Sequence, residues 1–192
     1  METKKEWTKM SRNLKKQGIN HTCAMNAKQQ KLGTATIMFA YVMDRDVLIR
    51  NTIEFMNDER GIKAEAMHYY EHMNRCREAY DNLFIPRARK EGDEEYLNTL
   101  LADCEAYDNG TYLEYAYDKA KKNREKRGTA NIERYKTYKP LTQQVEEANE
   151  QYGELINNKA VREFMEATGA TVEMEIKPDG PASTMFYARF HY

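Results

Sequence analysis

Two patterns of apolar and polar positions divide this chain. Between residues 34 and 168, apolar residues recur every three or four positions, which places them on one side of an α-helix. From residue 171 onward they alternate with polar residues, which is the period of a β-strand with one buried side. The pattern therefore predicts a mainly α protein that ends in a β-hairpin.

The helical pattern is interrupted several times. A glycine stands where each of five apolar patterns stops, as is common at helix C-termini: Gly61, Gly92, Gly110, Gly128 and Gly169. Pro86 limits or kinks the second segment, and a break is expected at Asn157-Asn158. We expect a bundle of about five helices, over residues 34–60, 62–84, 93–108, 111–127 and 140–169.

Two of these segments carry heptad-like seams of apolar residues. Such a seam is typical of a helix that packs nearly parallel or antiparallel to a neighbour. The first seam consists of Ile62, Ala66, Tyr69, Met73, Cys76, Tyr80 and Leu83. The second consists of Leu141, Val145, Ala148, Tyr152 and Leu155.

The C-terminal segment predicts two strands joined by a turn at residues 178–181. A two-stranded hairpin is marginally stable alone in water, so this one must dock on the helices or on another chain. The sequence thus suggests a basic N-terminal segment (1–19), a helical bundle (20–169) and a docking or assembly hairpin (170–192). The candidate partner-binding residues are the apolar ones of the last strand, Met185, Phe186, Tyr187, Phe190 and Tyr192.

Composition fits a helical protein in a reducing compartment. Apolar residues make up 41% and charged residues 32% of the chain. The three cysteines form no C-x-x-C pair, and no signal peptide is recognisable, so we expect a cytoplasmic protein or one assembled in a virion. The longest apolar run, residues 37–43, is far shorter than the roughly 20 residues that cross a bilayer. No membrane partner is therefore expected.

Charge is segregated although the net charge is only −1. Residues 1–33 carry eight Lys and Arg against two Glu, and residues 119–139 carry nine against two. Residues 93–118 carry eight Asp and Glu and no Lys or Arg. These blocks suggest complementary surfaces within the fold or between copies, or else the solvated ends and faces of helices.

Residues 68–72 spell His-Tyr-Tyr-Glu-His, which matches the H-x-x-E-H pattern of inverted zinc peptidases. On a helix, His68 and His72 would project from one side and could hold Zn²⁺, with Glu71 as general base. Glu65 adds an E-x-x-H spacing, but no second such pair exists for a di-iron site. The favoured interpretation is a pair of histidines at the rim of a core, with zinc as the alternative cofactor.

Other enzyme classes lack their sequence signals. No Gly-rich phosphate loop is present, and the two serines, Ser11 and Ser183, stand outside any nucleophile-elbow pattern. Cys76 and Cys104 fall on predicted apolar faces, where cysteines are usually inert. We therefore predict no enzymatic activity and no required cofactor.

Nucleic-acid binding is an alternative function. The basic segments 1–33 and 119–139 combine positive charge with aromatic residues, the mixture that phosphate contacts and base stacking need. A sequence pI near 6.5 and the adjoining acidic block argue against it. In the second segment the candidate residues are Lys121, Lys122, Arg124, Lys126 and Arg127.

The leading hypothesis is a non-enzymatic interaction or assembly protein, bound to itself or to a protein partner. It is based on the two seams, the opposed charge blocks and the aromatic hairpin. Helices followed by a terminal hairpin look like small viral connector or adaptor subunits, a similarity of architecture only. That similarity implies an oligomeric structural subunit.

Overall fold

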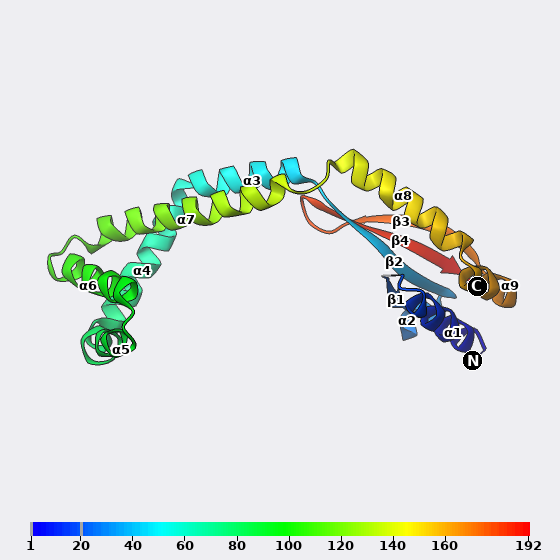
Figure 1. Ribbon diagram of the computed structural model, residues 1–192, viewed down its shortest axis with the longest axis horizontal. Helices are drawn as coiled ribbons and strands as arrows, with labels where there is room; N and C mark the ends of the chain where they lie inside the picture. Colours follow the sequence, from blue (N-terminus) through cyan, green and yellow to red (C-terminus); the bar gives the residue numbers. More distant parts are fainter. Residues whose placement is uncertain (1, 20) are drawn as a thin grey trace. The chain divides into compact units, whose positions relative to one another are not determined.

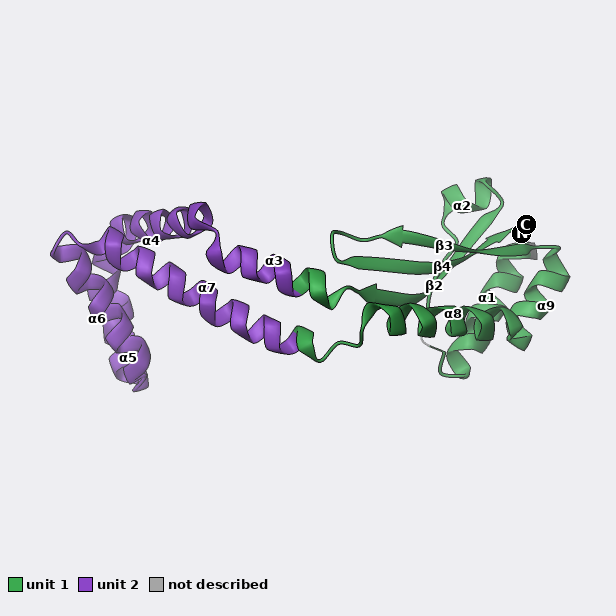
Figure 2. Ribbon diagram, turned by 90° about the horizontal axis from the view of Figure 1, so that it is seen from above, with its two compact units in different colours: residues 1–48, 135–192 green, residues 49–134 purple. Residues whose placement is uncertain are grey.

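The computed structural model describes residues 2–19 and 21–192 (Figure 1). Asn20, where the helical bundle was expected to begin, lies outside the described residues. The chain forms two compact units, shown in different colours in Figure 2. Unit 1 comprises residues 1–48 and 135–192, and unit 2 comprises residues 49–134.

Unit 1 is built from a sheet and helices. The sheet has four antiparallel strands in the order β1-β2-β4-β3. Its strands are β1 (Thr22–Ala24), β2 (Thr34–Met43), β3 (Thr171–Pro178) and β4 (Ser183–His191). The helices that lie wholly in this unit are α1 (Glu2–Lys16), α2 (Ala27–Lys31), α8 (Leu141–Asn157) and α9 (Lys159–Thr168).

The expected C-terminal hairpin is confirmed, and it docks within its own chain. β4 pairs with β3 on one side and with β2 on the other, from Thr34 opposite His191 to Met43 opposite Ser183. Residues 34–43 were predicted to be helical, and that prediction is wrong. β-Branched and aromatic residues favour the strand, and an irregularity in the register between Met38 and Ala40 disturbs the alternation that would have revealed it.

One side of the sheet packs against helices. Trp7 of α1, Phe164 of α9 and Phe190 of β4 meet edge to face, with ring centroids 5.3 to 5.7 Å apart. The helix α1 was not predicted from the sequence, where only its basic charge was noticed. Its buried residues Met10 and Leu14 join the same cluster, so the N-terminal segment forms part of the core.

The regular secondary structure of unit 2 is entirely helical. Its elements are α3 (Arg45–Asn57), α4 (Glu59–Ala79), a π-helical turn (Tyr80–Phe84), α5 (Ile85–Glu91), α6 (Glu94–Asp108) and α7 (Tyr112–Lys136). The N-terminal residues of α3 and the C-terminal residues of α7 belong to unit 1. The protein is thus mainly helical, but the expectation of about five helices is too low.

The seam predicted over residues 62–84 is largely confirmed. Ile62, Ala66, Met73 and Tyr80 are buried in the core of unit 2, whereas Leu83 is exposed. The π-helical turn rotates the chain just before Pro86, so the seam does not continue to Leu83. The break at Asn157-Asn158 is also confirmed, because the Asn158 side chain caps the start of α9.

Two glycines predicted to end helices lie inside helices instead. Gly61 lies in α4 and Gly128 in α7. A Cβ on Gly61 would overlap the side chains of Asp58 and Arg124, and one on Gly128 would overlap Met56. These glycines allow close packing within unit 2 and do not mark helix ends.

The aromatic cluster of unit 1 gives a first prediction. We expect Phe164→Ala to lower the free energy of unfolding of unit 1 by about 3–5 kcal/mol, because it leaves a cavity between Trp7 and Phe190. Trp7 is the single tryptophan of the chain, so its fluorescence in a urea titration reports on unit 1. Leu32→Ala, at a site 62% exposed, is the control and should change little. Equal effects of both variants would contradict the packing described.

Candidate interaction surfaces

The histidine pair lies on the outside of α4. His68 and His72 are both exposed, and the His72 Nδ1 atom lies 3.9 Å from the Cys76 sulfur. Among residues 2–19 and 21–192, no group of three or more His, Cys, Asp or Glu side chains is placed to hold a metal ion. Among the described residues, no further side chains are placed to complete a metal site with the two imidazoles.

Glu65, the nearby carboxylate considered with these histidines, belongs to a different network. Its side chain lies 3.0 Å from the Arg124 Nε atom and 2.9 Å from an Arg127 Nη atom, and it accepts a hydrogen bond from Tyr69. Burial alone would raise the pKa of Glu65, but these hydrogen bonds and the two positive charges lower it below its ordinary value. Glu65 therefore holds α4 to α7 as an ionised carboxylate.

The five basic residues proposed for nucleic-acid binding on α7 divide into two groups. Arg124 is buried, donates to the Phe55 carbonyl at 2.9 Å, and stacks on the Phe55 ring at 4.3 Å. Arg127 shares Glu65 with it. Lys121, Lys122 and Lys126 remain exposed. The structure therefore uses the two arginines for internal contacts.

We expect Arg124→Ala to destabilise unit 2 by about 1.5–3 kcal/mol, because it removes the charge-assisted hydrogen bonds of a buried guanidinium and leaves Glu65 with Arg127 as its one ion-pair partner among the described residues. Far-UV circular dichroism during urea unfolding measures this loss of helix. Lys126→Ala, on the exposed side of the same helix, should stay within about 0.5 kcal/mol of the natural protein. If the two variants unfold alike, Arg124 does not have the proposed role.

The acidic and basic blocks meet inside unit 2. Asp103 is only 3% exposed, and its two carboxylate oxygens lie 2.6 and 2.8 Å from the Lys119 Nζ atom. Burial, with the added charge of Asp103, raises the pKa of both Tyr80 and Tyr115 to about 12. Part of the charge segregation seen in the sequence is thus used in packing.

A basic surface covers the outside of α1. An open groove of about 670 Å³ runs along the helix, and its lining includes Lys4, Lys5, Lys9, Arg12 and Lys16. All five side chains are exposed, and the Lys9 Nζ atom lies 3.6 Å from the Glu6 Oε2 atom. Because Trp7, Met10 and Leu14 face the core, the positive charges of α1 face solvent together.

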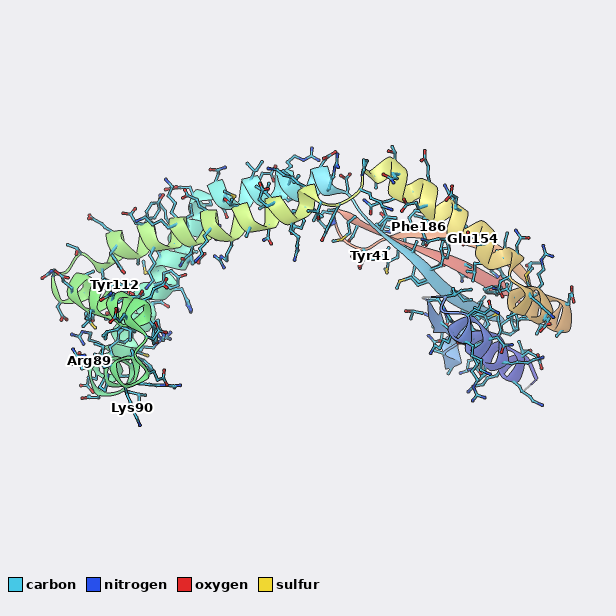
Figure 3. All side chains as sticks on the ribbon, in the orientation of Figure 1. Tyr41, Arg89, Lys90, Tyr112, Glu154 and Phe186 are labelled. Carbon is cyan, nitrogen blue, oxygen red and sulfur yellow. The ribbon has the colours of Figure 1, made fainter. Side chains whose placement is uncertain are left out.

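The five partner-binding candidates of β4 lie on two sides of the sheet. Phe186 and Phe190 are buried, and Figure 3 shows Phe186 on the side of the sheet that faces α8. Met185 and Tyr187 lie on the opposite side and are half-buried. Tyr192 donates a hydrogen bond to the Thr34 carbonyl at 3.3 Å. The structure therefore does not bring these five residues together.

β3 carries an apolar surface that the sequence predicts as the buried side of a strand and not as a site for a partner. Val172, Met174 and Ile176 lie opposite Phe190, Ala188 and Phe186, so they face the same side of the sheet as the core. Phe186 is 3% exposed, yet Met174 is 37% and Ile176 is 54% exposed. We call Val172, Met174 and Ile176 the β3 strip. The helices cover this side over β4 but not over the outer part of β3.

No family model, curated protein or solved structure matches this chain. Within the described part of the chain, no helix is both long and apolar enough to cross a membrane. The surfaces themselves must therefore support any functional proposal.

Proposed function

We propose that this chain is a non-enzymatic assembly protein, an oligomeric structural subunit whose contact surface includes the β3 strip. The observation that carries the proposal is the exposure of Met174 and Ile176 on the core side of the sheet. Phe186 and Ala188, their direct neighbours on β4, are buried by the helices. A second chain placed against β3 would continue that packing.

The β3 strip also lies on an edge strand of the sheet. Exposed strand edges present unpaired backbone groups and invite another strand, so proteins commonly blunt them. Burying a large aliphatic side chain contributes about 1.5–3 kcal/mol, and Met174 and Ile176 would each add a fraction of that on association. Backbone pairing along β3 would add affinity to this apolar contact.

The test is the mass of the protein in solution, measured by light scattering over a range of concentrations. We expect a multiple of the chain mass of 22.6 kDa for the natural protein. The double variant Met174→Lys/Ile176→Lys should be a monomer, because association would bury two unpaired ammonium groups from each copy. Its circular dichroism should match that of the natural protein.

Ile53→Lys is the matched control, because Ile53 is 47% exposed and lies in unit 2. This control should associate normally. Deleting residues 171–192 is not a suitable test, since β4 contributes Phe186, Ala188 and Phe190 to the core. A monomer at every concentration would contradict the proposed function.

Nucleic-acid binding through α1 is a second candidate function. The specific observation in its favour is the groove on α1, whose lining has five exposed basic residues and one acidic residue, Glu6, and so offers a mainly positive surface to a phosphate backbone. Unlike Arg124 and Arg127 on α7, these side chains are not committed to the core.

We expect fluorescence anisotropy with single-stranded DNA to show binding that weakens steeply as salt rises. Lys5→Ala and Arg12→Ala should each reduce the slope of log affinity against log salt by about 1. The control is Lys159→Ala, at a lysine on α9 that is also solvent-exposed but lies outside the groove. Binding that does not depend on salt, or that Lys159→Ala weakens equally, would contradict this candidate.

A further inference from the structure

β3 is an edge strand along its whole length. It pairs with β4 alone, from Thr171 opposite His191 to Pro178 opposite Thr184. β1, at the other edge of the sheet, has only three residues, which limits it as a template for pairing. The eight-residue edge of β3 is therefore the longer place for a strand of another chain to add.

The hydrogen-bond directions on β3 follow from the turn that joins it to β4. The Asp179 N–H donates to the Ser183 carbonyl at 2.8 Å, so these two residues form a hydrogen-bonded pair. Such pairs alternate along an antiparallel ladder, so Lys177, Glu175 and Glu173 direct their backbone groups toward β4. The backbone groups of Val172, Met174 and Ile176 then point to the open edge.

The same alternation explains Pro178. Its nitrogen falls at a position that faces the open edge, so its missing N–H removes no bond to β4. The outward donors that remain belong to the three residues of the β3 strip. A single partner strand would therefore contact both the unpaired backbone groups and the apolar side chains of the β3 strip.

Charge complementarity selects a second copy of this chain and one register. When two β3 strands pair antiparallel about a two-fold axis perpendicular to the sheet, each side chain stays on its own side of the sheet. One residue therefore lies opposite its own copy, with the axis between them. With the axis at Met174, Glu173 would face Glu175 of the second copy. With the axis at Ile176, Glu175 would face Lys177 of the second copy, but Glu173 would face Asp179. The first register thus makes two like-charge pairs and no opposite pair, and the second makes two of each, so neither gains from charge.

With the axis at Glu175, Glu173 faces Lys177 of the second copy on both sides of the axis. Met174 then faces Ile176 of the second copy. The Met174 and Ile176 residues of both copies exchange outward backbone hydrogen bonds. The two Glu175 side chains meet at the axis, but each is already neutralised. Its Oε1 atom lies 3.0 Å from an Arg189 Nη atom and 3.2 Å from the Lys177 Nζ atom.

We propose that two copies of this chain pair through β3 in this register. The two four-stranded sheets then form one continuous sheet, and the two β3 strips become neighbours on its apolar side. The same patch serves both copies, so the assembly closes as a dimer of twice the chain mass of 22.6 kDa. This inference rests on the proposed assembly function and specifies its partner.

Disulfide cross-linking tests the register. In a background with Cys23→Ser, Cys76→Ser and Cys104→Ala, Glu175→Cys places two thiols at the axis. Opposed residues of a non-hydrogen-bonded antiparallel pair have Cα atoms about 4.5 Å apart, within the range of a disulfide. We expect most of the protein to become a covalent dimer under mild oxidation. Glu173→Cys is the control, because its two copies would lie about 13 Å apart and should not cross-link.

Charge reversal provides a second measurement that leaves Glu175 in place. Glu173→Lys and Lys177→Glu should each raise the dissociation constant of the dimer about tenfold, because each creates two like-charge pairs. The double variant Glu173→Lys/Lys177→Glu restores opposite charges and should return the constant to near its natural value. Additive weakening in the double variant would overturn the register.

The outcomes separate this inference from the proposed function. A multimer that Met174→Lys/Ile176→Lys dissociates, but in which Glu175→Cys does not cross-link, overturns the β3 pairing and leaves the assembly function standing. Equal cross-linking of the Glu175→Cys and Glu173→Cys variants also overturns it, since random collision gives that result. A monomer at all concentrations overturns both proposals.

Discussion

The sheet of unit 1 has an apolar side that is wider than the layer of helices packed against it. Trp7, Phe164 and Phe190 fill the space over the central strands, and this contact orders α1, α9 and the C-terminal hairpin together. The outer part of β3 receives no such cover. Its alternating pattern is that of a half-buried strand, yet Met174 and Ile176 remain exposed to water, while Val172 packs against the core.

Several charged residues that the sequence offers as candidates for chemistry or nucleic-acid binding serve packing in the structure. Glu65, Arg124 and Arg127 form one ion-pair network in unit 2, and Asp103 and Lys119 form another ion pair. The buried charges among them, Asp103 and Arg124, need their partners, so these two side chains are held in place and are not free for a ligand. A positive surface that remains exposed in unit 1 is the outer side of α1.

Local signals in the sequence predicted the hairpin, the break before α9 and most of the seam on α4, because each depends on neighbouring residues. They did not predict β2, whose apolar run suits a helix or a strand until its pairing with β4 is known. Gly61 and Gly128 were misassigned for a similar reason. Their role depends on side chains distant in sequence, Arg124 and Met56.

The candidate site was predicted only in part. The alternation of residues 172–176 identified a strand with one apolar side, but sequence alone does not show how far the helices extend over it. The candidates chosen on β4 were the most apolar residues of the segment, and two of them, Phe186 and Phe190, are buried for that reason. The exposure of Met174 and Ile176 depends on how far the helices extend over the sheet, which only the structure shows.

Amide hydrogen exchange at Met174 and Ile176 tests the central claim most directly, because these N–H groups point to the open edge of β3. If two copies pair there, both amides should exchange slowly at high protein concentration and rapidly on dilution, while the amide of Glu175, bonded within the hairpin, changes less. Rapid exchange of Met174 and Ile176 at every concentration, in a protein that is nevertheless dimeric, would contradict the account.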